Sequence, residues 1–384
     1  MPAHPSSAVG LYIHLPWCLH KCAYCDFNSH AVAADALPES DYTQALIEDL
    51  KLASADIKDR AVQSIFIGGG TPSLFSAGAI ETLLQACRQY TRVTAACEIT
   101  LETNPGTFEY QKFKDFHAAG INRLSIGAQS FNDVYLQSLG RIHAAAEALR
   151  AIDIAAAIGF NNINIDIMFG LPRQTLADAI KDVYIAVQQP VQHISYYQLT
   201  LEPNTIFHRF PPPIPDSDKQ WEIQEHALQL LAKHHFERYE VSAYARQNQS
   251  CVHNKNYWQY HDYLGIGAGA HTKLTLDGVI YRQQRVRQPD SYRRAVYTHK
   301  HIIRTHTVRS ADQVFEFMLN NLRLSQGFSP THFEATTSLD WHKIQPVITE
   351  LIEENLLDYD GMYYKASPLG YRFLDQITAK FLPE

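Results

Sequence analysis

The chain has 384 residues, enough for two or three domains, and 46% of them are hydrophobic, so a sizeable core can form. The formal net charge of −7 gives no general attraction for nucleic acid or an anionic membrane, so we expect neither as a partner. There is no run of about 18 apolar residues and no basic N-terminal region before an apolar stretch, which predicts no transmembrane segment and no signal peptide. Six cysteines are too few for a disulfide framework in a chain of this length, so we expect a reducing, cytoplasmic location.

Six short apolar runs in the first half of the chain alternate with amphipathic helical stretches. The runs are Val9–Leu15, Ser64–Gly70, Cys97–Pro105, Asn122–Ser130, Asn162–Gly170 and His193–Leu201, and the helical stretches include Tyr42–Ala53 and Leu176–Val187. Alternation of strand and helix predicts a parallel sheet with right-handed crossovers. Six such units predict an α/β fold of the partial-barrel type, an incomplete version of the eight-unit barrel that closes at about 250 residues.

A second region begins near the proline-rich segment PPPIPDSDK (Pro211–Lys219), because these prolines cannot continue a helix or a central strand. It contains the tyrosine-rich segments ERYEVSAYA and CVHNKNYWQYHDYLGIGAGAH. We expect residues 211–309 to link the first domain, residues 1–210, to the rest of the chain and to form an α+β extension of it.

The third region covers residues 310–384. Helical patterns at Ala311–Leu324 and Trp341–Asn355 precede LLDYDGMYYKAS, in which Asp360-Gly361 predicts a hairpin. This order of helices and hairpin predicts a small winged-helix-like domain. Such folds often bind DNA, but this segment has no basic cluster, so we expect a lid or a partner surface instead.

Three cysteines lie close together directly after the first predicted strand. Cys18, Cys22 and Cys25, in HLPWCLHKCAYCDFNSH, have the spacing CxxxCxxC, which supplies three thiolates to a four-iron cluster and leaves one iron open. A zinc site or unrelated cysteines would be the alternative. Zinc sites usually pair two CxxC units, or CxxC with histidines, and the sequence has no second unit. The spacing therefore predicts a 4Fe-4S cluster with one open iron.

The cysteine spacing, with Tyr24 before the last cysteine, resembles that of the radical S-adenosylmethionine (SAM) enzymes. IFIGGGTPS (Ile65–Ser73) resembles their glycine-rich SAM-binding segment. LYIHLPWC, CDFNSH, LETNPGT, LSIGAQS and DIMFGLP resemble one branch, which contains the oxygen-independent coproporphyrinogen III dehydrogenases and the HemW-type heme chaperones. The resemblance runs from about residue 9 to the C-terminus and implies a partial (β/α)6 radical SAM barrel that binds a 4Fe-4S cluster and SAM.

Polar residues and glycines follow several of the predicted strands, and ligands of α/β sheets and barrels bind at the C-terminal ends of strands. Each of these residues alone has a structural explanation, because a glycine run can be a turn and an acidic residue can pair with arginine or cap a helix. The resemblance implies that the following positions line the SAM site: Tyr12, Gly69, Gly70, Thr71, Glu102, Gln129, Arg141 and Asp166.

The run CVHNKNYW (Cys251–Trp258) combines a histidine with aromatic residues. Histidine is a common axial ligand of heme iron and aromatic rings pack on porphyrins, although a histidine in an aromatic loop is often a hydrogen-bonded structural residue. HNKNYW resembles the HNxxYW motif of the heme-chaperone members of this branch, which implies that His253 takes part in heme binding. We expect this motif near the mouth of the barrel; His271, in GAGAH, is a weaker candidate.

One departure separates the two functions of this branch. The dehydrogenases carry a further cysteine two residues after the third, where this chain has Phe27, so the decarboxylation of coproporphyrinogen III is not expected. The sequence predicts a cytoplasmic heme chaperone that binds heme, a 4Fe-4S cluster and SAM and passes heme to an acceptor hemoprotein, such as one of the respiratory chain. The alternatives are an oxygen-independent coproporphyrinogen III oxidase and a radical SAM enzyme with another substrate, and the sequence identifies no catalytic residue.

Overall fold

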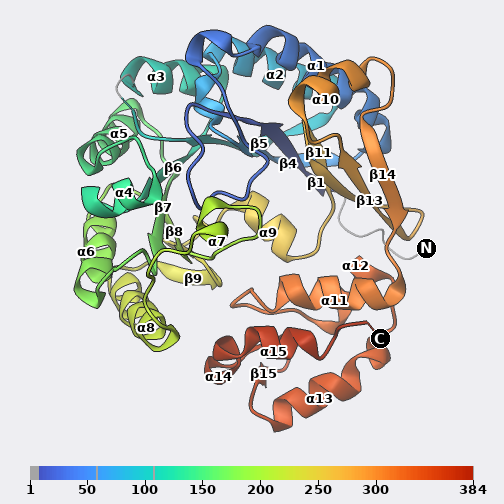
Figure 1. Ribbon diagram of the computed structural model, residues 1–384. Helices are drawn as coiled ribbons and strands as arrows, with labels where there is room; N and C mark the ends of the chain where they lie inside the picture. The colour runs from blue at the N-terminus through green and yellow to red at the C-terminus, as the bar shows by residue number, and fades with distance from the viewer. Residues whose placement is uncertain (1–7, 58, 107–108, 384) are drawn as a thin grey trace.

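The computed structural model describes residues 8–57, 59–106 and 109–383, and its main feature is one large sheet with helices along its outer side (Figure 1). Six parallel strands follow one another across its centre in chain order. They are β1 (Ala8–Leu15), β4 (Ala61–Gly69), β5 (Arg92–Thr103), β6 (Arg123–Gln129), β7 (Ile163–Phe169) and β8 (His193–Gln198). The six strands predicted from the sequence are therefore confirmed, although β5 begins before the predicted Cys97.

Helices connect these strands and pack on the outer side of the sheet (Figure 1). They are α1 (Glu39–Ala53), α2 (Ala77–Tyr90), α3 (Glu109–Ala119), α4 (Asp133–Leu139), α5 (Ala145–Ile158) and α6 (Leu176–Val187), and α8 (Ser217–Lys233) follows β8. The predicted helix Leu176–Val187 coincides with α6. β6 is buried at all seven of its positions, as expected for a parallel strand that is covered on both faces.

The region after residue 210 adds strands to both edges of the same sheet. On one edge, β11 (Tyr263–Ile266) pairs in parallel with β1, and β12 (His271–Leu276), β13 (Val279–Arg285) and β14 (Ile302–Thr307) follow as antiparallel strands. On the other edge, β10 (Ala243–Ala245) pairs with β8, and β9 (Glu237–Glu240) pairs with β10. The sheet is thus continuous across residue 210, and the predicted division of the chain at residues 210 and 309 stays a prediction.

Besides α8, the described part of the chain between β8 and β14 contains three helices. They are α7 (Ile206–Arg209), α9 (Val252–Trp258) and α10 (Pro289–Val296). α9 packs against β4 and β1, and Figure 1 shows it in yellow, on the opposite side of these strands from α1 and α2. It carries the HNKNYW segment, so this segment is part of the interior of the fold.

The last part of the chain forms a small unit, drawn in orange and red in Figure 1, whose hydrophobic core also includes Tyr260 and Ile280 of the preceding region. Its elements are α11 (Ser310–Asn321), α12 (Pro330–Thr337), η4 (Trp341–Lys343), α13 (Gln345–Glu353), β15 (Leu357–Tyr359), β16 (Tyr364–Ala366), α14 (Pro368–Arg372) and α15 (Leu374–Ala379). β15 and β16 form the predicted hairpin, with Gly361 at a φ of 97° in its turn. Within the described ranges, no helix has both the length and the hydropathy that crossing a bilayer requires.

Candidate functional site

The cysteine loop is fixed to the sheet by backbone hydrogen bonds. β2 (Trp17–Cys18) pairs with β3 (His30–Ala31) and closes the loop that holds the three cysteines. The N–H of Gly70 donates to the carbonyl of Leu15 (2.8 Å), and the N–H of Thr71 donates to the carbonyl of Trp17 (2.7 Å). The ends of β1 and β4 therefore hold the cysteine loop and the glycine-rich segment side by side.

The thiols of Cys18, Cys22 and Cys25 line one cavity of about 310 Å³ at the C-terminal ends of the strands. A 4Fe-4S cluster takes one thiolate per iron, so three thiols around one cavity fit such a cluster. The Cys22 sulfur lies 3.8 Å from a guanidinium nitrogen of Arg141, so a positive charge lies next to this thiol. Among the described residues, no three His, Cys, Asp or Glu side chains come close enough together to hold a single metal ion, as a zinc site would require.

Most residues predicted for the SAM site line this same cysteine cavity. These are Gly69, Gly70, Thr71, Glu102, Gln129, Arg141 and Asp166. Tyr12 instead lines a neighbouring cavity of about 440 Å³, which we call the tyrosine cavity. The two cavities share Phe27, Gly69 and Glu102, so they lie on either side of these residues.

The two glycines have a conformation and surroundings that exclude larger residues. Gly69 has a φ of 120°, and a side chain at Gly70 would collide with the backbone of Trp17. The Gly69 N–H donates to the Glu102 carboxylate at 3.0 Å. The close approach of the cysteine loop therefore explains the glycines, and both glycines line the cysteine cavity.

Two buried carboxyl groups give this cavity its electrostatic character. Burial, together with the nearby charge of Asp166, raises the pKa of Glu102 to about 7, and burial also raises the pKa of Asp166. Asp166 accepts hydrogen bonds from Asn164 (2.8 Å) and Ser125 (3.5 Å). Carboxyl groups with little access to water favour a ligand that brings positive charge or hydrogen-bond donors. SAM has an amine, two hydroxyl groups and a sulfonium cation, so it brings the positive charge and the hydrogen-bond donors that these carboxyl groups favour.

Two further residues of the cysteine cavity were not predicted from the sequence. Asn104 donates to the Thr71 hydroxyl (2.8 Å) and accepts from Arg141, and the Tyr197 hydroxyl donates to Gln129 (2.7 Å). Asn104 directly follows β5, and Tyr197 lies near the end of β8. The rule that selected the other strand-end residues therefore applies to both of them and could have found them.

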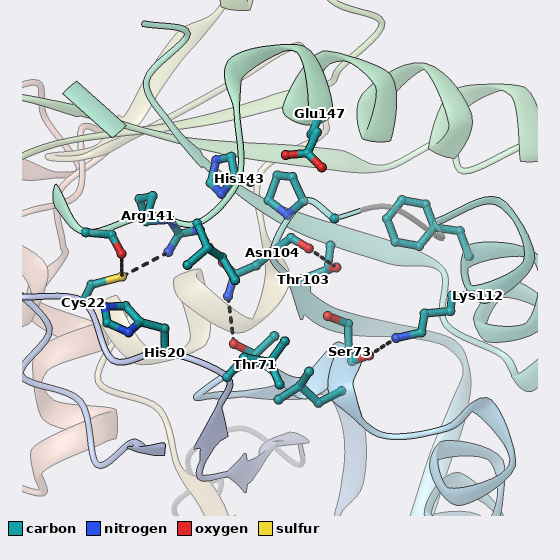
Figure 2. A pocket seen from close by; sticks show the side chains of 17 residues that line it. His20, Cys22, Thr71, Ser73, Thr103, Asn104, Lys112, Arg141, His143 and Glu147 are labelled. Carbon is teal, nitrogen blue, oxygen red and sulfur yellow. Dashed lines mark hydrogen bonds between the residues drawn. The ribbon is translucent and has the colours of Figure 1, made fainter. Parts of the chain in front are cut away.

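A third cavity, of about 380 Å³, lies next to the cysteine cavity (Figure 2). Figure 2 shows Arg141 between Cys22 and Asn104, and these three residues line both cavities. On the other side of this cavity, Lys112 donates to the carbonyl of Ser73 at 3.2 Å. Arg141 therefore lies between the third cavity and the cysteine cavity, and it also contacts the sulfur of Cys22, a predicted cluster ligand.

His253 lies in the interior of the fold. Its Nδ1 is hydrogen-bonded to the Ser64 hydroxyl at 2.9 Å, its ring faces Gly10, and its side chain is 3% exposed. Burial lowers its pKa to about 3. The motif that carries His253 is expected near the mouth of the barrel. This is wrong for His253, because α9 packs against β1 and β4 and buries this side chain. Its part in heme binding stays a prediction, and Tyr257 of the same motif does line the tyrosine cavity.

Comparison with known proteins agrees with this architecture. A family model for the Radical SAM superfamily matches residues 12–183, and one for the HemN C-terminal domain matches residues 308–373. The chain is 43% identical to the heme chaperone HemW of Escherichia coli (strain K12) over 98% of each chain. It is 44% identical to the heme chaperone HemW of Haemophilus influenzae over 100% of each chain. The chain belongs to the HemW family.

A solved structure of the coproporphyrinogen III oxidase HemN from Escherichia coli, a radical SAM enzyme, has the same fold as this HemW family member. The TM-score is 0.82 over 99% of this chain and 91% of that one, at 20% sequence identity. The predicted radical SAM fold with its extension and small C-terminal domain is therefore confirmed. Membership of the radical SAM superfamily implies a 4Fe-4S cluster and SAM, and the cysteine cavity contains residues that fit both.

Proposed function

We propose that this protein is a cytoplasmic heme chaperone, which binds heme, a 4Fe-4S cluster and SAM and transfers the heme to an acceptor hemoprotein such as a respiratory-chain protein. The observation that carries the proposal is the likeness, from end to end, to proteins named heme chaperones, at 43 and 44% identity. A cluster with an open iron requires a reducing compartment, which supports the cytoplasm as its location.

The residues of the cysteine cavity would hold the cluster and SAM. Cys18, Cys22 and Cys25 are the proposed cluster ligands, and Tyr12 with the strand-end residues described above is the proposed SAM site. When bound and reduced, such a cluster supplies an electron to SAM. The chain itself contributes the positive charge of Arg141 next to Cys22 and the acceptors Glu102 and Asp166, which orient the donors of SAM.

The main alternative is oxygen-independent oxidation of coproporphyrinogen III. The fold likeness to HemN fits this reaction, but at 20% identity it concerns the fold alone. Phe27, at the position where the dehydrogenases have a cysteine, lines both cavities and is 60% exposed. A phenyl ring can neither transfer a proton nor bind a metal as a thiol does. The chain therefore lacks one group that this alternative requires.

The test compares the two activities on the same anaerobically reconstituted protein. Heme-loaded protein is mixed with a heme-free acceptor that carries a separable tag, and the Soret band is followed in both fractions. We expect heme to move to the acceptor faster than from a heme-loaded protein of an unrelated family. In parallel, coproporphyrinogen III, SAM and a reductant should yield no protoporphyrinogen. Conversion of coproporphyrinogen without heme transfer would overturn the proposal in favour of the oxidase.

A further inference from the structure

The tyrosine cavity is a second binding space next to the SAM site. Its volume is about 440 Å³, within the range of small-molecule sites, and it opens beside the cysteine loop. Three tyrosines line it, Tyr12 from β1, Tyr257 from α9 and Tyr263 from β11, and the rings of the last two lie 4.2 Å apart. Such a wall of aromatic rings suits a flat, largely apolar ligand.

Two histidines line this cavity, and only one has an available ring. His14 is 6% exposed, and both of its nitrogens are engaged, one with the Tyr12 hydroxyl and one with the carbonyl of Asn28, each at 2.9 Å. His271 is exposed at the start of β12, and no hydrogen bond engages its ring within the part of the chain that the structure describes. Its ring nitrogens are therefore available to coordinate a metal.

The rim of the cavity carries a positive charge and an apolar ring. Arg287 lines the cavity with its side chain exposed. The Asn28 side chain donates to the carbonyls of Ala268 (2.9 Å) and Arg287 (2.8 Å), so it ties the cysteine loop to the segment that carries His271. Phe27, next to Asn28, is thereby held at the boundary between the two cavities.

We propose that the tyrosine cavity is the heme site of this protein, an inference that rests on the proposed heme-chaperone function. His271 coordinates the iron, Tyr257, Tyr263 and Phe27 contact the porphyrin, and Arg287 pairs with the propionate carboxylates. An iron porphyrin is a flat apolar ring that has a metal in its centre and carboxylates at one edge, which matches these groups. An exposed ligand at an open cavity also allows the heme to leave, as a chaperone requires.

The ligand is tested by titration of the full-length, anaerobically reconstituted protein with hemin, read by the Soret band. His271→Ala should shift the band and weaken hemin binding at least about tenfold, since loss of even an outer partner of a metal ligand typically costs that much. Added imidazole should restore the wild-type band in His271→Ala, which a purely structural role would not allow. His306→Ala is the control, because His306 is an exposed histidine on β14 that does not line the cavity.

The outcomes separate this inference from the proposed function. If the wild type binds no hemin, both are overturned. If the wild type binds hemin and His271→Ala behaves like His306→Ala, the heme site is wrong while the chaperone function stands. If His253→Ala gives the loss that imidazole restores, the iron is coordinated in the interior and the inference is likewise overturned.

Arg287 is tested with hemin and its dimethyl ester, which lacks the carboxylates. Arg287→Gln should weaken the binding of hemin roughly twofold to fivefold, as expected for an exposed ion pair, and leave the binding of the ester unchanged. Arg304→Gln, an exposed arginine on β14, is the control. Equal binding of hemin to Arg287→Gln and to the wild type, or equal weakening with both ligands, would overturn the pairing with the propionates.

Discussion

The six cysteines differ in their surroundings. Cys18, Cys22 and Cys25 line one cavity, although Cys18 is itself buried and burial raises its pKa. Cys87, Cys97 and Cys251 are buried away from that cavity, and burial raises the pKa of each of these thiols to about 12. Since Cys87, Cys97 and Cys251 do not line the cavity that the other three thiols share, they are not placed to bind the same cluster.

We therefore expect Cys18→Ala, Cys22→Ala and Cys25→Ala each to lose most of the bound iron and the broad visible absorbance of the cluster. Cys87→Ala, Cys97→Ala and Cys251→Ala are the matched controls and should keep both. Iron analysis and absorbance spectra of anaerobically purified proteins measure this. A normal cluster in all three of the first variants would contradict the assignment.

Glu102 makes the folded protein sensitive to pH. Its pKa is about 7 in the folded chain against a usual 4.5, because it is buried and faces Asp166. Below about pH 4.5 it is protonated in the folded and unfolded chain alike. Between about pH 4.5 and 7 the unfolded chain loses this proton while the folded chain keeps it, so the folded chain loses stability as the pH rises. The loss is on the order of 3 kcal/mol at most for a pKa raised from 4.5 to about 7, and it is complete above pH 7.

Glu102→Gln should therefore stabilise the SAM-free protein at about pH 8, and the gain should shrink as the pH falls toward 5. The same variant should bind SAM more weakly, roughly 5- to 150-fold, because it loses a charged acceptor. Urea unfolding at several pH values and calorimetry with SAM measure the two effects. Glu81→Gln, on the exposed surface of α2, is the control. An unchanged SAM affinity of Glu102→Gln would contradict the assignment of Glu102 to the SAM site.

At the scale of single elements, Glu98 of β5 fixes the short helix α9. Its carboxylate accepts from the N–H groups of Val252 and His253, both at 3.1 Å, and Glu98 is 7% exposed. The first N–H groups of a helix have no partner within the helix, so this carboxylate stabilises the start of α9. It also holds the helix against the strands of the sheet.

Glu98→Ala should lower the free energy of unfolding by about 1–3 kcal/mol, the usual cost of leaving buried donors without a partner. Glu98→Gln keeps one acceptor oxygen and should fall between it and the wild type. Urea unfolding measures both, with Glu237→Ala, an exposed residue of β9, as the control. If Glu98→Ala is as stable as that control, the hydrogen bonds of the Glu98 carboxylate do not stabilise the start of α9.

The position of α9 could not be predicted from the sequence, whereas much of the sheet could. The six parallel strands could be predicted because they are apolar runs with helices between them, and the strand-end residues could be predicted because parallel strands end at one edge. β11, with only four residues, pairs with β1, which lies some 250 residues away in the chain, and no local pattern reveals such a pairing. For the same reason the motif gave no sign that His253 would contact Ser64.

At the scale of the whole molecule, the HNKNYW segment connects the cavities to the C-terminal unit. Tyr257 lines the tyrosine cavity, while the next residue, Trp258, lies under the guanidinium of Arg323 at 4.2 Å. Arg323 belongs to the C-terminal unit and also bonds to Glu240 of β9 at 2.8 Å. One short helix is therefore in contact with the proposed heme site and with the small domain.

A second contact of the C-terminal unit is centred on Glu316 of α11. Its two oxygens accept from Arg282 of β13 at 3.1 and 2.7 Å, and the Tyr260 hydroxyl donates to it at 2.7 Å. Arg282 and Glu316 are 22 and 23% exposed, so water competes little for these bonds. Hydrogen bonds of this charged kind are among the stronger ones in proteins.

Glu316→Ala should therefore loosen the C-terminal unit from the sheet, at a cost of about 1.5–3 kcal/mol, the usual value of a hydrogen bond to a charged group. We expect limited proteolysis to cut the chain near residue 309 faster than in the wild type, since a released unit exposes the segment between β14 and α11. Glu353→Ala, on the exposed face of α13, keeps the contact and should be cut at the wild-type rate. Equal cutting rates of Glu316→Ala and Glu353→Ala would mean that the contact around Glu316 does not hold the unit in place.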